Sequence, residues 1–399
     1  MNAPHSALNA QPDRILVRGL NWLGDAVMST PALLRLREQF PRARITLLTP
    51  EKLRDLWLAG PEPDGGGRHH PALDAVITFR AGESLFSVSR KLRAGHFDLA
   101  VVFPNSPRSA LEVWLANIPR RIGYAQPWRN CFLTQSIAPR TGAVEMHKRS
   151  AAEIKTLIAE TRPDPASRRP HRASGIAGPP SAHHLYQYLH LVAALGANPE
   201  PLAPRLAVTP EEIAAIAKKF GLDAASTGGR PLLGLNPGAE YGPAKRWPVE
   251  RFAAAARELQ ERAHCLWLIV GGKGDSALAE QVASAFDASG FTFHNLCGKT
   301  SLRELMALLK SCRALLTNDT GPMHVAAALG TPVVVPFGST SPGLTGPGLP
   351  GDPRHRLLES GVPCSPCFLR ECPIDFRCMN SISVERVVEA VLQNANLEP

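Results

Sequence analysis

Short apolar runs alternate with longer amphipathic stretches along most of the chain, a pattern typical of the strands and helices of a parallel α/β protein. In the first half, a helix is predicted to run from about residue 25 to Gln39. Pro31 lies inside it, so this proline should either kink the helix or mark its true start. The strands predicted in this half are residues 14–20, 44–49, 74–79 and 98–103.

The second half repeats the alternation. Helix 210–220 precedes strand 231–236, and the chain closes with helix 383–394. The elements predicted between them are helices 249–262, 301–310 and 320–329, a helix after Gly274, and strands 265–270, 292–296, 314–317 and 333–335. Two α/β domains, each with a doubly wound parallel sheet, follow from this order.

A proline-rich stretch after the predicted helix 184–195 divides the chain. We therefore predict an N-terminal domain at residues 1–196, a linker at 197–207 and a C-terminal domain at 208–399, with a ligand cleft between the domains. Three further segments are predicted to lack helix and strand: a disordered lead at residues 1–13, a loop rich in Gly and Pro at 60–71, and a mobile insertion at about 161–183.

The composition is that of a globular protein, which we expect to be kept in the cytosol. No apolar run approaches the roughly 18 residues of a membrane-spanning helix, and the N-terminus lacks the apolar core of a signal peptide. The 44 Lys and Arg outnumber the 35 Asp and Glu, and the net charge of +9 favours an anionic partner such as a nucleotide sugar, an anionic lipid or nucleic acid. Nucleic acid is disfavoured, because basic and aromatic residues do not interleave and no nucleic-acid motif is present.

The most informative segment is the predicted strand–helix–strand unit at residues 314–338. Asp319 or Thr320 is placed to cap the helix, and Gly321 lets the backbone come close to a ligand. A helix N-terminus at the carboxyl edge of a parallel sheet is an anion site. His324 lies one turn further along, where it either reaches the same ligand or packs on the sheet. An ordinary capped helix explains these residues equally well.

A second stretch, residues 236–248, joins a strand to the next helix. Its prolines and glycines, Gly238 among them, predict a stiff loop, and Lys245 and Arg246 overlook the same sheet edge. Lysine can bind a phosphate as a point charge, and arginine can bind one through two N–H groups at once. With the helix N-terminus, this loop would fit a diphosphate. The alternative is a loop that is stiff only for packing, with a solvated basic pair.

Two other turns between strand and helix carry candidate polar groups. After the first strand, Asp25 is placed to act as a general base toward a sugar hydroxyl, although helix capping alone explains an aspartate there. After strand 265–270, Gly271 would approach a nucleotide closely and Asp275 would bond a ribose hydroxyl. That turn lacks the spacing of the dinucleotide and Walker fingerprints, so a plain loop is the other interpretation.

The eight cysteines fall into two groups. Four are scattered in apolar or mixed sequence and are predicted to be buried, reduced thiols: Cys131, Cys265, Cys297 and Cys312. The others lie close together in the sequence: Cys364, Cys367, Cys372 and Cys378. Their spacing is not that of two Cys-x2-Cys pairs and no histidine lies among them, so a structural metal site and reduced or redox-labile thiols both remain open.

Taken together, these stretches resemble the ADP-heptose:lipopolysaccharide heptosyltransferases of glycosyltransferase family 9, most closely the heptosyltransferase II type. The resemblance runs in family order from about Arg14 to Gly338. It is carried by residues 19–25 with Ser29 and Pro31, and by residues 104–111, 121–123, 237–248 and 317–329. It implies an α/β fold of the GT-B type, in which two Rossmann-like domains with doubly wound parallel sheets face across a cleft and the second holds the ADP of the donor.

The resemblance also implies roles for individual residues. Asp25 would be the catalytic base, and Lys245 would bind the donor phosphates. The acceptor side would include Asn21, Trp22, Asn105 and Ser106. The rest of the predicted donor site is Arg246, Asp319, Thr320, Gly321, His324, Gly238, Gly271 and Asp275.

The reaction implied is an inverting, metal-independent transfer of L-glycero-D-manno-heptose from ADP-heptose to the first heptose of heptosyl-Kdo-lipid A. No cofactor is expected, because fixed positive charge on the leaving diphosphate would replace Mg²⁺. The expected partners are the ADP-sugar donor, the anionic lipid A core acceptor and, transiently, the cytosolic face of the inner membrane, with no nucleic acid. The protein would be cytoplasmic and peripheral at that membrane.

The sequence also departs from the family pattern. Pro322 stands where Leu or Met is expected, and the insertion at 161–183 has no recognised counterpart. The C-terminal cysteine group looks like one that some heptosyltransferase II relatives carry and others lack. Three rivals remain. One is another family 9 transferase, heptosyltransferase I-like or acting on a protein, and another is a different GT-B nucleotide-sugar enzyme. The third is a non-enzymatic basic module that binds nucleic acid, which the lack of a nucleic-acid motif disfavours.

Overall fold

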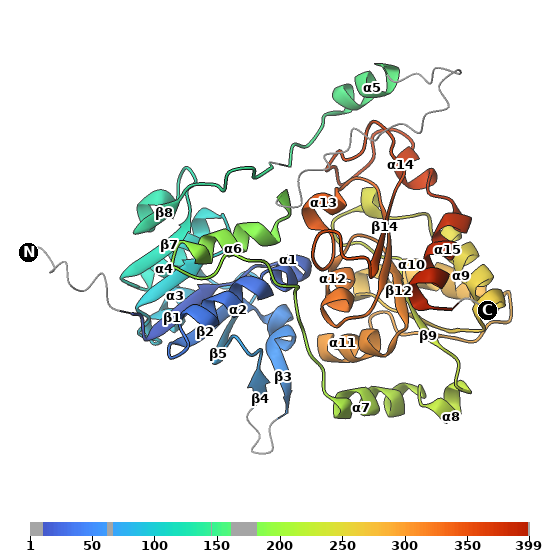
Figure 1. Cartoon of the computed structure of the whole chain (residues 1–399), viewed down its shortest axis with the longest axis horizontal. Coiled ribbons are helices and arrows are strands. Elements are labelled where there is room, and N and C mark those ends of the chain that lie inside the picture. Colours follow the sequence, from blue (N-terminus) through green and yellow to red (C-terminus); the bar gives the residue numbers. More distant parts are fainter. Residues whose placement is uncertain (1–10, 62–66, 145, 161–181, 398–399) are drawn as a thin grey trace, which may run out of the picture. The chain divides into compact units, whose positions relative to one another are not determined.

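The computed structural model describes residues 11–61, 67–144, 146–160 and 182–397. Nearly all of the predicted lead at 1–13 and of the predicted insertion at 161–183 lies outside these residues. The chain divides into two compact units. The first comprises Met1–Ala143 with His184–Leu202, and the second comprises Val144–His183 with Ala203–Pro399. Each unit has its own sheet (Figure 1). Each also has its own hydrophobic core.

The first unit is built on a six-stranded parallel sheet in the order β5-β2-β1-β6-β7-β8. Val17 of the central strand pairs with Leu47 on one side and Val101 on the other. The order reverses between β1 and β6, and in doubly wound sheets ligands bind at the carboxyl ends of the two strands at that switch point. The strands are β1 (Arg14–Arg18), β2 (Arg44–Pro50), β5 (Ala75–Phe79), β6 (Leu99–Val102), β7 (Arg120–Tyr124) and β8 (Gln135–Ile137).

Helices flank this sheet (Figure 1). The helix predicted near Pro31 is two helices that meet at Ser29, and Pro31 lies in the first turn of the second, so it marks a helix start. Helix α2 packs against α6, and α3 against α4. The helices of this unit are α1 (Leu23–Met28), α2 (Thr30–Gln39), α3 (Leu85–Arg93), α4 (Pro107–Leu115) and α6 (Leu185–Ala193), with 3-10 turns η2 (Glu51–Trp57) and η3 (Asn130–Phe132).

The second unit has the same strand order in another six-stranded parallel sheet, β11-β10-β9-β12-β13-β14. Its switch point lies between β9 and β12, where Asn236 pairs with Thr317 at the carboxyl ends. The predicted doubly wound parallel sheets are therefore confirmed in both halves of the chain. The strands are β9 (Leu232–Asn236), β10 (Leu266–Ile269), β11 (Phe293–Asn295), β12 (Ala314–Thr317), β13 (Val333–Phe337) and β14 (His355–Glu359).

Local sequence explains where several helices of this unit begin and end. A capping box between Thr209 and Glu212 starts α7, and Gly221, with a φ of 64°, ends it. The helices are α5 (Ala151–Glu160), α7 (Pro210–Phe220), α8 (Ala224–Thr227), α9 (Val249–Ala263), α10 (Ser276–Asp287), α11 (Leu302–Ser311), α12 (Gly321–Ala328), α13 (Pro342–Thr345), α14 (Arg377–Asn380) and α15 (Val384–Ala395), with 3-10 turns η5 (Pro243–Lys245) and η6 (Lys273–Asp275).

Two predictions about the segments between elements are wrong. The stretch predicted as a loop at 60–71 lies partly in an antiparallel pair, β3 (Leu58–Pro61) and β4 (Gly67–His69). Residues 146–160, which we assigned to the N-terminal domain, group with the second unit. The reason lies in the tertiary packing, because Ile154 of α5 is buried against Cys364 and Cys367. Such contacts cannot be predicted from the local sequence pattern.

Candidate functional site

In the second unit, the loop after β9 is fixed to the end of β12. The side-chain amide of Asn318 donates to the carbonyl of Pro237 at 2.8 Å, and its oxygen accepts from the backbone N–H of Trp247 at 2.9 Å. Trp247 is itself fully buried, and its indole N–H donates to the carbonyl of Ile382 at 3.1 Å. Because both ends of the loop are held, Lys245 and Arg246 have defined positions at the switch point.

Lys245 forms a largely buried ion pair. Its Nζ lies 2.6 Å from Oδ2 of Asp319, and the two side chains are only 13% and 4% exposed. The hydroxyl of Thr340 donates to the same Oδ2, also at 2.6 Å, and the ammonium lies 4.9 Å from the ring centroid of Tyr241. A lysine held in this way presents one positive charge at a fixed point of the sheet edge, and an anionic ligand there must share it with Asp319.

The N-terminus of α12 lies directly after this aspartate. Thr320 is the N-cap residue, but no side chain caps the helix, and Pro322 lies in its first turn. One of our two predictions was that Asp319 caps this helix. It does not, and its carboxylate pairs with Lys245 instead. Gly321 is the first helical residue, and His324 is buried within the first turn. The structure thus brings together Lys245, Asp319, Thr320, Gly321 and His324.

The loops after β9 and β10 also meet. A Cβ on Gly238 would lie 2.2 Å from Cγ of Asp275, so only a glycine permits the contact. The carboxylate of Asp275 accepts from the backbone N–H of Gly272 at 3.1 Å, and Gly271 packs against Asp275 and the thiol of Cys297. Gly238, Gly271 and Asp275 are therefore neighbours, as the predicted donor site requires.

In this structure the Arg246 side chain makes a hydrogen bond within its own loop. Its guanidinium donates to the carbonyl of Ala239 at 3.2 Å, and its Nε is buried with no hydrogen-bond partner among the described residues. A buried guanidinium nitrogen without a partner is costly, so this side chain remains a candidate for contact with a ligand.

In the first unit, Asp25 lies in the first turn of α1, after β1. The N-cap position belongs to Trp22, which makes no side-chain capping bond, so Asp25 is not the N-cap residue. The hydroxyl of Tyr188, on α6, lies 3.4 Å from Oδ1 of Asp25. Burial raises the pKa of Tyr188 well above its usual range, and the neighbouring Asp25 charge raises it further. Tyr188 is therefore a neutral donor to the carboxylate, and nothing in the sequence pointed to it.

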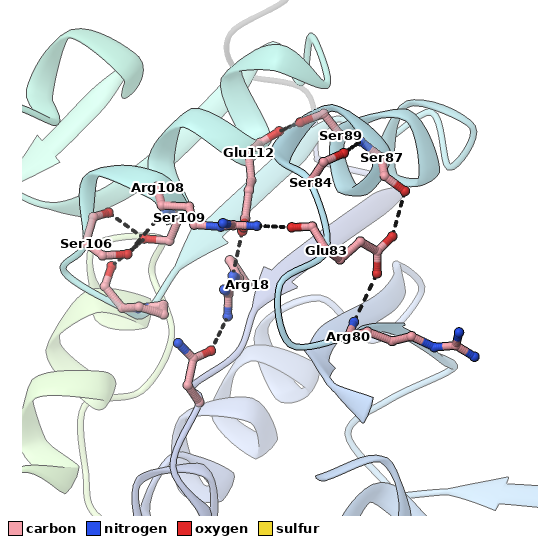
Figure 2. A network of polar contacts seen from close by, with 12 residues as sticks. Arg18, Arg80, Glu83, Ser84, Ser87, Ser89, Ser106, Arg108, Ser109 and Glu112 are labelled. Carbon is pink, nitrogen blue, oxygen red and sulfur yellow. Dashed lines mark hydrogen bonds and ion pairs between the residues drawn. The ribbon is translucent and has the colours of Figure 1, made fainter. Parts of the chain in front are cut away.

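The turn before Asp25 is held by a buried ion pair (Figure 2). Nε of Arg18 donates to Glu112 at 2.9 Å, and Nη1 donates to Asn21 Oδ1 at 2.9 Å. Arg18 is 2% exposed and Glu112 is fully buried. Burial lowers the pKa of Arg18, and the Glu112 charge opposes that shift. Arg108 adds a second contact to Glu112 at 3.1 Å, so the pair fixes α4 to the end of β1.

The remaining predicted acceptor residues lie at the same sheet edge. Ser106 is the N-cap of α4, where its hydroxyl accepts from the N–H of Ser109. Asn105 lies 3.4 Å from Nη1 of the fully buried Arg129. Asn21 and Trp22 are exposed, and the ammonium of Lys52 lies 5.5 Å from the Trp22 ring centroid. A cap role for Ser106 does not depend on any ligand.

The cysteines are all free thiols. Cys265, Cys297 and Cys312 are buried as predicted, but Cys131 is exposed, because it lies in the 3-10 turn η3 at the surface. No group of three or more His, Cys, Asp or Glu side chains within the described ranges is arranged to hold a metal ion. Among the same residues, no helix is long and apolar enough to cross a bilayer.

Comparison with known proteins identifies relatives that match most of the chain. The family model described as glycosyltransferase family 9 (heptosyltransferase) matches residues 166–376. The lipooligosaccharide heptosyltransferase 2 of Haemophilus ducreyi is 30% identical over 358 residues, which cover 88% of this chain and 90% of that protein. The lipopolysaccharide heptosyltransferase 2 of Salmonella typhimurium is 31% identical over 84% of this chain and 85% of its own.

Solved structures of similar fold give the same family as the sequence comparisons. The structure of Escherichia coli ADP-heptose lps heptosyltransferase II superposes with a TM-score of 0.70 at 26% identity, over 96% of this chain and 98% of that one. A glycosyl transferase family 9 protein from Veillonella parvula has the same fold, with a TM-score of 0.71 at 23% identity over 96% and 97% of the two chains.

Proposed function

We propose a specific reaction from the premise that this chain belongs to glycosyltransferase family 9 and is a glycosyltransferase of the GT-B fold class. The reaction is the transfer of heptose in the synthesis of the lipopolysaccharide core. The donor is ADP-heptose, and the acceptor is the first inner-core heptose of heptosyl-Kdo-lipid A. The observation that carries the proposal is the Lys245–Asp319 pair at the switch point of the second sheet, beside the N-terminus of α12.

The second unit binds the donor in this proposal. The diphosphate lies against Lys245 and the first turn of α12, at Thr320 and Gly321, where the helix dipole favours an anion. His324 and Asp319 line the same point. The glycine-rich junction of Gly238, Gly271 and Asp275 receives the adenosine, because glycines allow close approach of a ribose and a carboxylate accepts from its hydroxyls.

The first unit supplies the base. Asp25 takes the proton from the acceptor hydroxyl as that oxygen attacks the anomeric carbon of the heptose. The bond from that carbon to the β-phosphate oxygen breaks, and ADP leaves with the electron pair, so the configuration inverts. Tyr188 orients the Asp25 carboxylate, and the neighbouring residues Asn21, Trp22, Asn105 and Ser106 contact the acceptor.

Positive charge fixed on the protein stabilises the leaving diphosphate, so no Mg²⁺ is needed for the chemical step. Arg246 assists Lys245 in this role. The net charge of +9 suits an anionic lipid acceptor and transient work at the cytosolic face of the inner membrane by a cytoplasmic protein.

Release of ADP from ADP-heptose tests the proposal. The purified chain is assayed with lipid A core acceptors that carry zero, one or two heptoses, with EDTA and with added Mg²⁺. Release only with the one-heptose acceptor, unchanged by EDTA or Mg²⁺, is the expected result. Release with the acceptor that lacks heptose would instead assign a heptosyltransferase I-like activity, and stimulation by Mg²⁺ would contradict metal independence.

The role of Asp25 has its own matched variants. Asp25→Ala should lower kcat by about 10³-fold while calorimetric binding of ADP is kept, since a general base supplies roughly 10²–10⁴ in rate. Asp55→Ala removes another partly buried aspartate of the first unit and should leave the rate near wild type. A near-normal rate in Asp25→Ala would show that this carboxylate is structural.

A further inference from the structure

Large aromatic side chains are exposed on one helical layer of the first unit. In this layer α3 and α4 lie side by side (Figure 1), and α4 also contacts η3. Five large hydrophobic side chains are exposed in the described part of the chain, and three of them belong to this layer: Phe86, Trp114 and Trp128. The ring centroid of Trp114 lies 5.7 Å from that of Phe132 in η3. We call these four side chains the aromatic surface. A group of exposed apolar side chains is typical of an interaction site.

The backbone of Trp128 supports a role for its ring. The φ angle of Trp128 is 71°, in the left-handed region that bulky residues seldom adopt. The turn is held on one side by the N–H of Gln126, which donates to Asn130 Oδ1 at 2.9 Å. On the other side, the N–H of Phe132 donates to the carbonyl of Arg129, also at 2.9 Å. A glycine would fit this turn with less strain, yet a tryptophan that is 86% exposed occupies it.

The segment that builds this layer is strongly basic. Residues 80–140 contain nine Lys or Arg against three Asp or Glu, a net charge of +6 within a chain of +9. Three of the cations are paired with carboxylates: Arg80, Lys91 and Arg108. The remaining excess favours an anionic partner, and a lipid surface with anionic headgroups attracts Lys and Arg that lie close to it.

Two exposed cations lie next to the aromatic surface. On α3, Arg90 and Arg93 follow Phe86 at helical spacing, so the three share one face. The guanidinium of Arg93 donates to the carbonyl of Leu115 at 2.6 Å, which places it beside Trp114. Neither arginine takes part in an ion pair among the residues that the structure describes, so both charges can face an external anion. Exposed aromatic rings flanked by cations are typical of proteins that lie at the surface of an anionic membrane.

We propose that the aromatic surface seats the first unit on an anionic lipid bilayer. Trp114 and Trp128 lie at the level of the headgroups, and Arg90 and Arg93 face the anionic phosphates. Tryptophan is favoured at this depth because its ring is apolar while its indole N–H can still bond water or headgroups. The buried apolar area and the charge attraction act together, so binding is reversible and weakens as salt rises.

The aromatic surface adjoins the sheet edge at which the acceptor is proposed to bind. Trp128 lies in the loop after β7, at the carboxyl end of the first sheet. The next residue, Arg129, is fully buried, and its Nη1 donates to the carbonyl of Pro104 at 2.6 Å, beside Asn105. A lipid-linked acceptor could therefore present its sugar to this edge while its acyl chains stay in the bilayer. This consequence rests on the proposed function, but the binding of lipid does not.

Vesicle binding gives the first test. The full-length chain is sedimented with vesicles of phosphatidylethanolamine and phosphatidylglycerol that contain no glycolipid acceptor, and with vesicles of phosphatidylcholine alone. Binding to the anionic vesicles, weakened by added salt, is expected, with little binding to the neutral ones. Anionic vesicles with brominated acyl chains should also quench the tryptophan fluorescence of the wild type. No binding to the anionic vesicles, or equal binding to both kinds, overturns the proposal.

Trp128→Ser locates the surface. Because the side chain is 86% exposed, the variant should fold, and it should bind anionic vesicles at least about tenfold more weakly, the scale of one large apolar side chain left in water. Met146→Ser changes an exposed large hydrophobic residue of the second unit and should bind like the wild type. Equal affinity of the two variants would contradict the assignment.

Arg90→Gln tests the charge. It should weaken binding to anionic vesicles about fivefold, the effect of one cation near an anionic surface. Arg257→Gln, at an exposed position of α9 in the second unit, is the matched control and should have no effect. If both substitutions weaken binding alike, the attraction comes from the whole protein and the assigned surface is wrong.

A second copy of the chain is the other occupant that such a surface could accept. Sedimentation equilibrium without lipid should show no dimer that depends on Trp128. A dimer that dissociates in Trp128→Ser, together with no binding to vesicles, would overturn the proposal in favour of self-association.

Kinetics separates this surface from the proposed function. With an acceptor embedded in vesicles, Trp128→Ser should raise KM for the acceptor and keep kcat, and with the same acceptor after removal of its acyl chains it should behave like the wild type. A raised KM for both acceptors would mean that Trp128 contacts the sugar, which overturns the docking role. If no heptose transfer occurs with any acceptor, the proposed function fails, while binding to acceptor-free vesicles still decides the docking surface.

Discussion

The two units share one strand order but place their charges differently at the switch point. In the first unit, Arg18 and Glu112 form a buried ion pair at the end of β1, and the candidate base, Asp25, lies in the first turn of α1 with a neutral tyrosine as neighbour. In the second unit, the Lys245–Asp319 pair lies at the sheet edge itself. The same topology thus uses a charge pair to fix the backbone in one unit and to present a cation in the other.

This difference fits what each edge is proposed to do. A general base must be able to accept a proton, and in this unit the charge pair that orders the preceding turn joins Arg18 to Glu112, while Arg18 also bonds Asn21. A diphosphate site needs positive charge, so the lysine lies at the edge and its partner holds it in position. The changes that follow test the two units separately.

Glu112→Gln should have the largest effect on stability. It leaves Arg18 buried without its carboxylate, and breaking a buried pair costs about 3–5 kcal/mol in the free energy of unfolding. Denaturant unfolding measures it. Glu304→Gln, which removes the partner of Lys219 in an exposed pair of the second unit, should cost about 1 kcal/mol or less. Equal costs would show that the Arg18–Glu112 pair does not order the first unit.

The lowered pKa of His355 predicts that acid destabilises the second unit. Burial lowers the pKa of His355, on β14, to about 4, below its unfolded value of about 6.5. The folded state therefore resists protonation: the stability is fully present above pH 6.5 and is lost as the pH falls toward 4, by about 3 kcal/mol. Unfolding between pH 7 and 4 measures the loss. His355→Phe should flatten this dependence, and the exposed His147→Gln should not. The same slope in all three proteins would contradict the assignment.

Lys245→Met tests the charge at the donor edge. The variant keeps the length of the side chain and removes the ammonium, and kcat/KM for the donor should fall about 100-fold, the scale of losing one stabilising group on a developing charge. Initial rates against donor concentration measure the change. Lys218→Met, at an exposed position of α7, is the control and should leave kcat/KM unchanged. If both variants behave alike, the pair is structural, as in the first unit.

Tyr188→Phe should have the smallest effect. It removes one long hydrogen bond to Asp25, at 3.4 Å, so kcat should fall about tenfold with little change in KM for the donor. Turnover at saturating substrate measures it. Tyr186→Phe, on the same helix, serves as the comparison and should keep full activity. A loss as large as that of Asp25→Ala would mean that Tyr188 takes part directly in the proton transfer.

The strand and helix pattern of the sequence predicted most strands of both six-stranded sheets. Strands such as residues 314–317 are short, apolar and bounded by polar turns, so periodicity alone located them. The strands of these two sheets that were not predicted, β7, β8 and β14, lie toward one edge of each sheet, where mixed polar sequence and partial burial weaken the pattern. The predicted donor loop and helix were also found at one sheet edge, because parallel strands bring their carboxyl ends together.

The sequence by itself therefore determined the two parallel α/β units and their order, because these follow from local periodicity. It also determined the family to which the chain belongs, because the family motifs follow one another along the chain. Only the tertiary structure decided which groups meet: Tyr188 with Asp25, Arg18 with Glu112, and Trp114 with Phe132. Such contacts join residues that lie far apart in the chain or in a loop without periodicity. Burial and distance, which no local pattern encodes, set their charges and their chemistry.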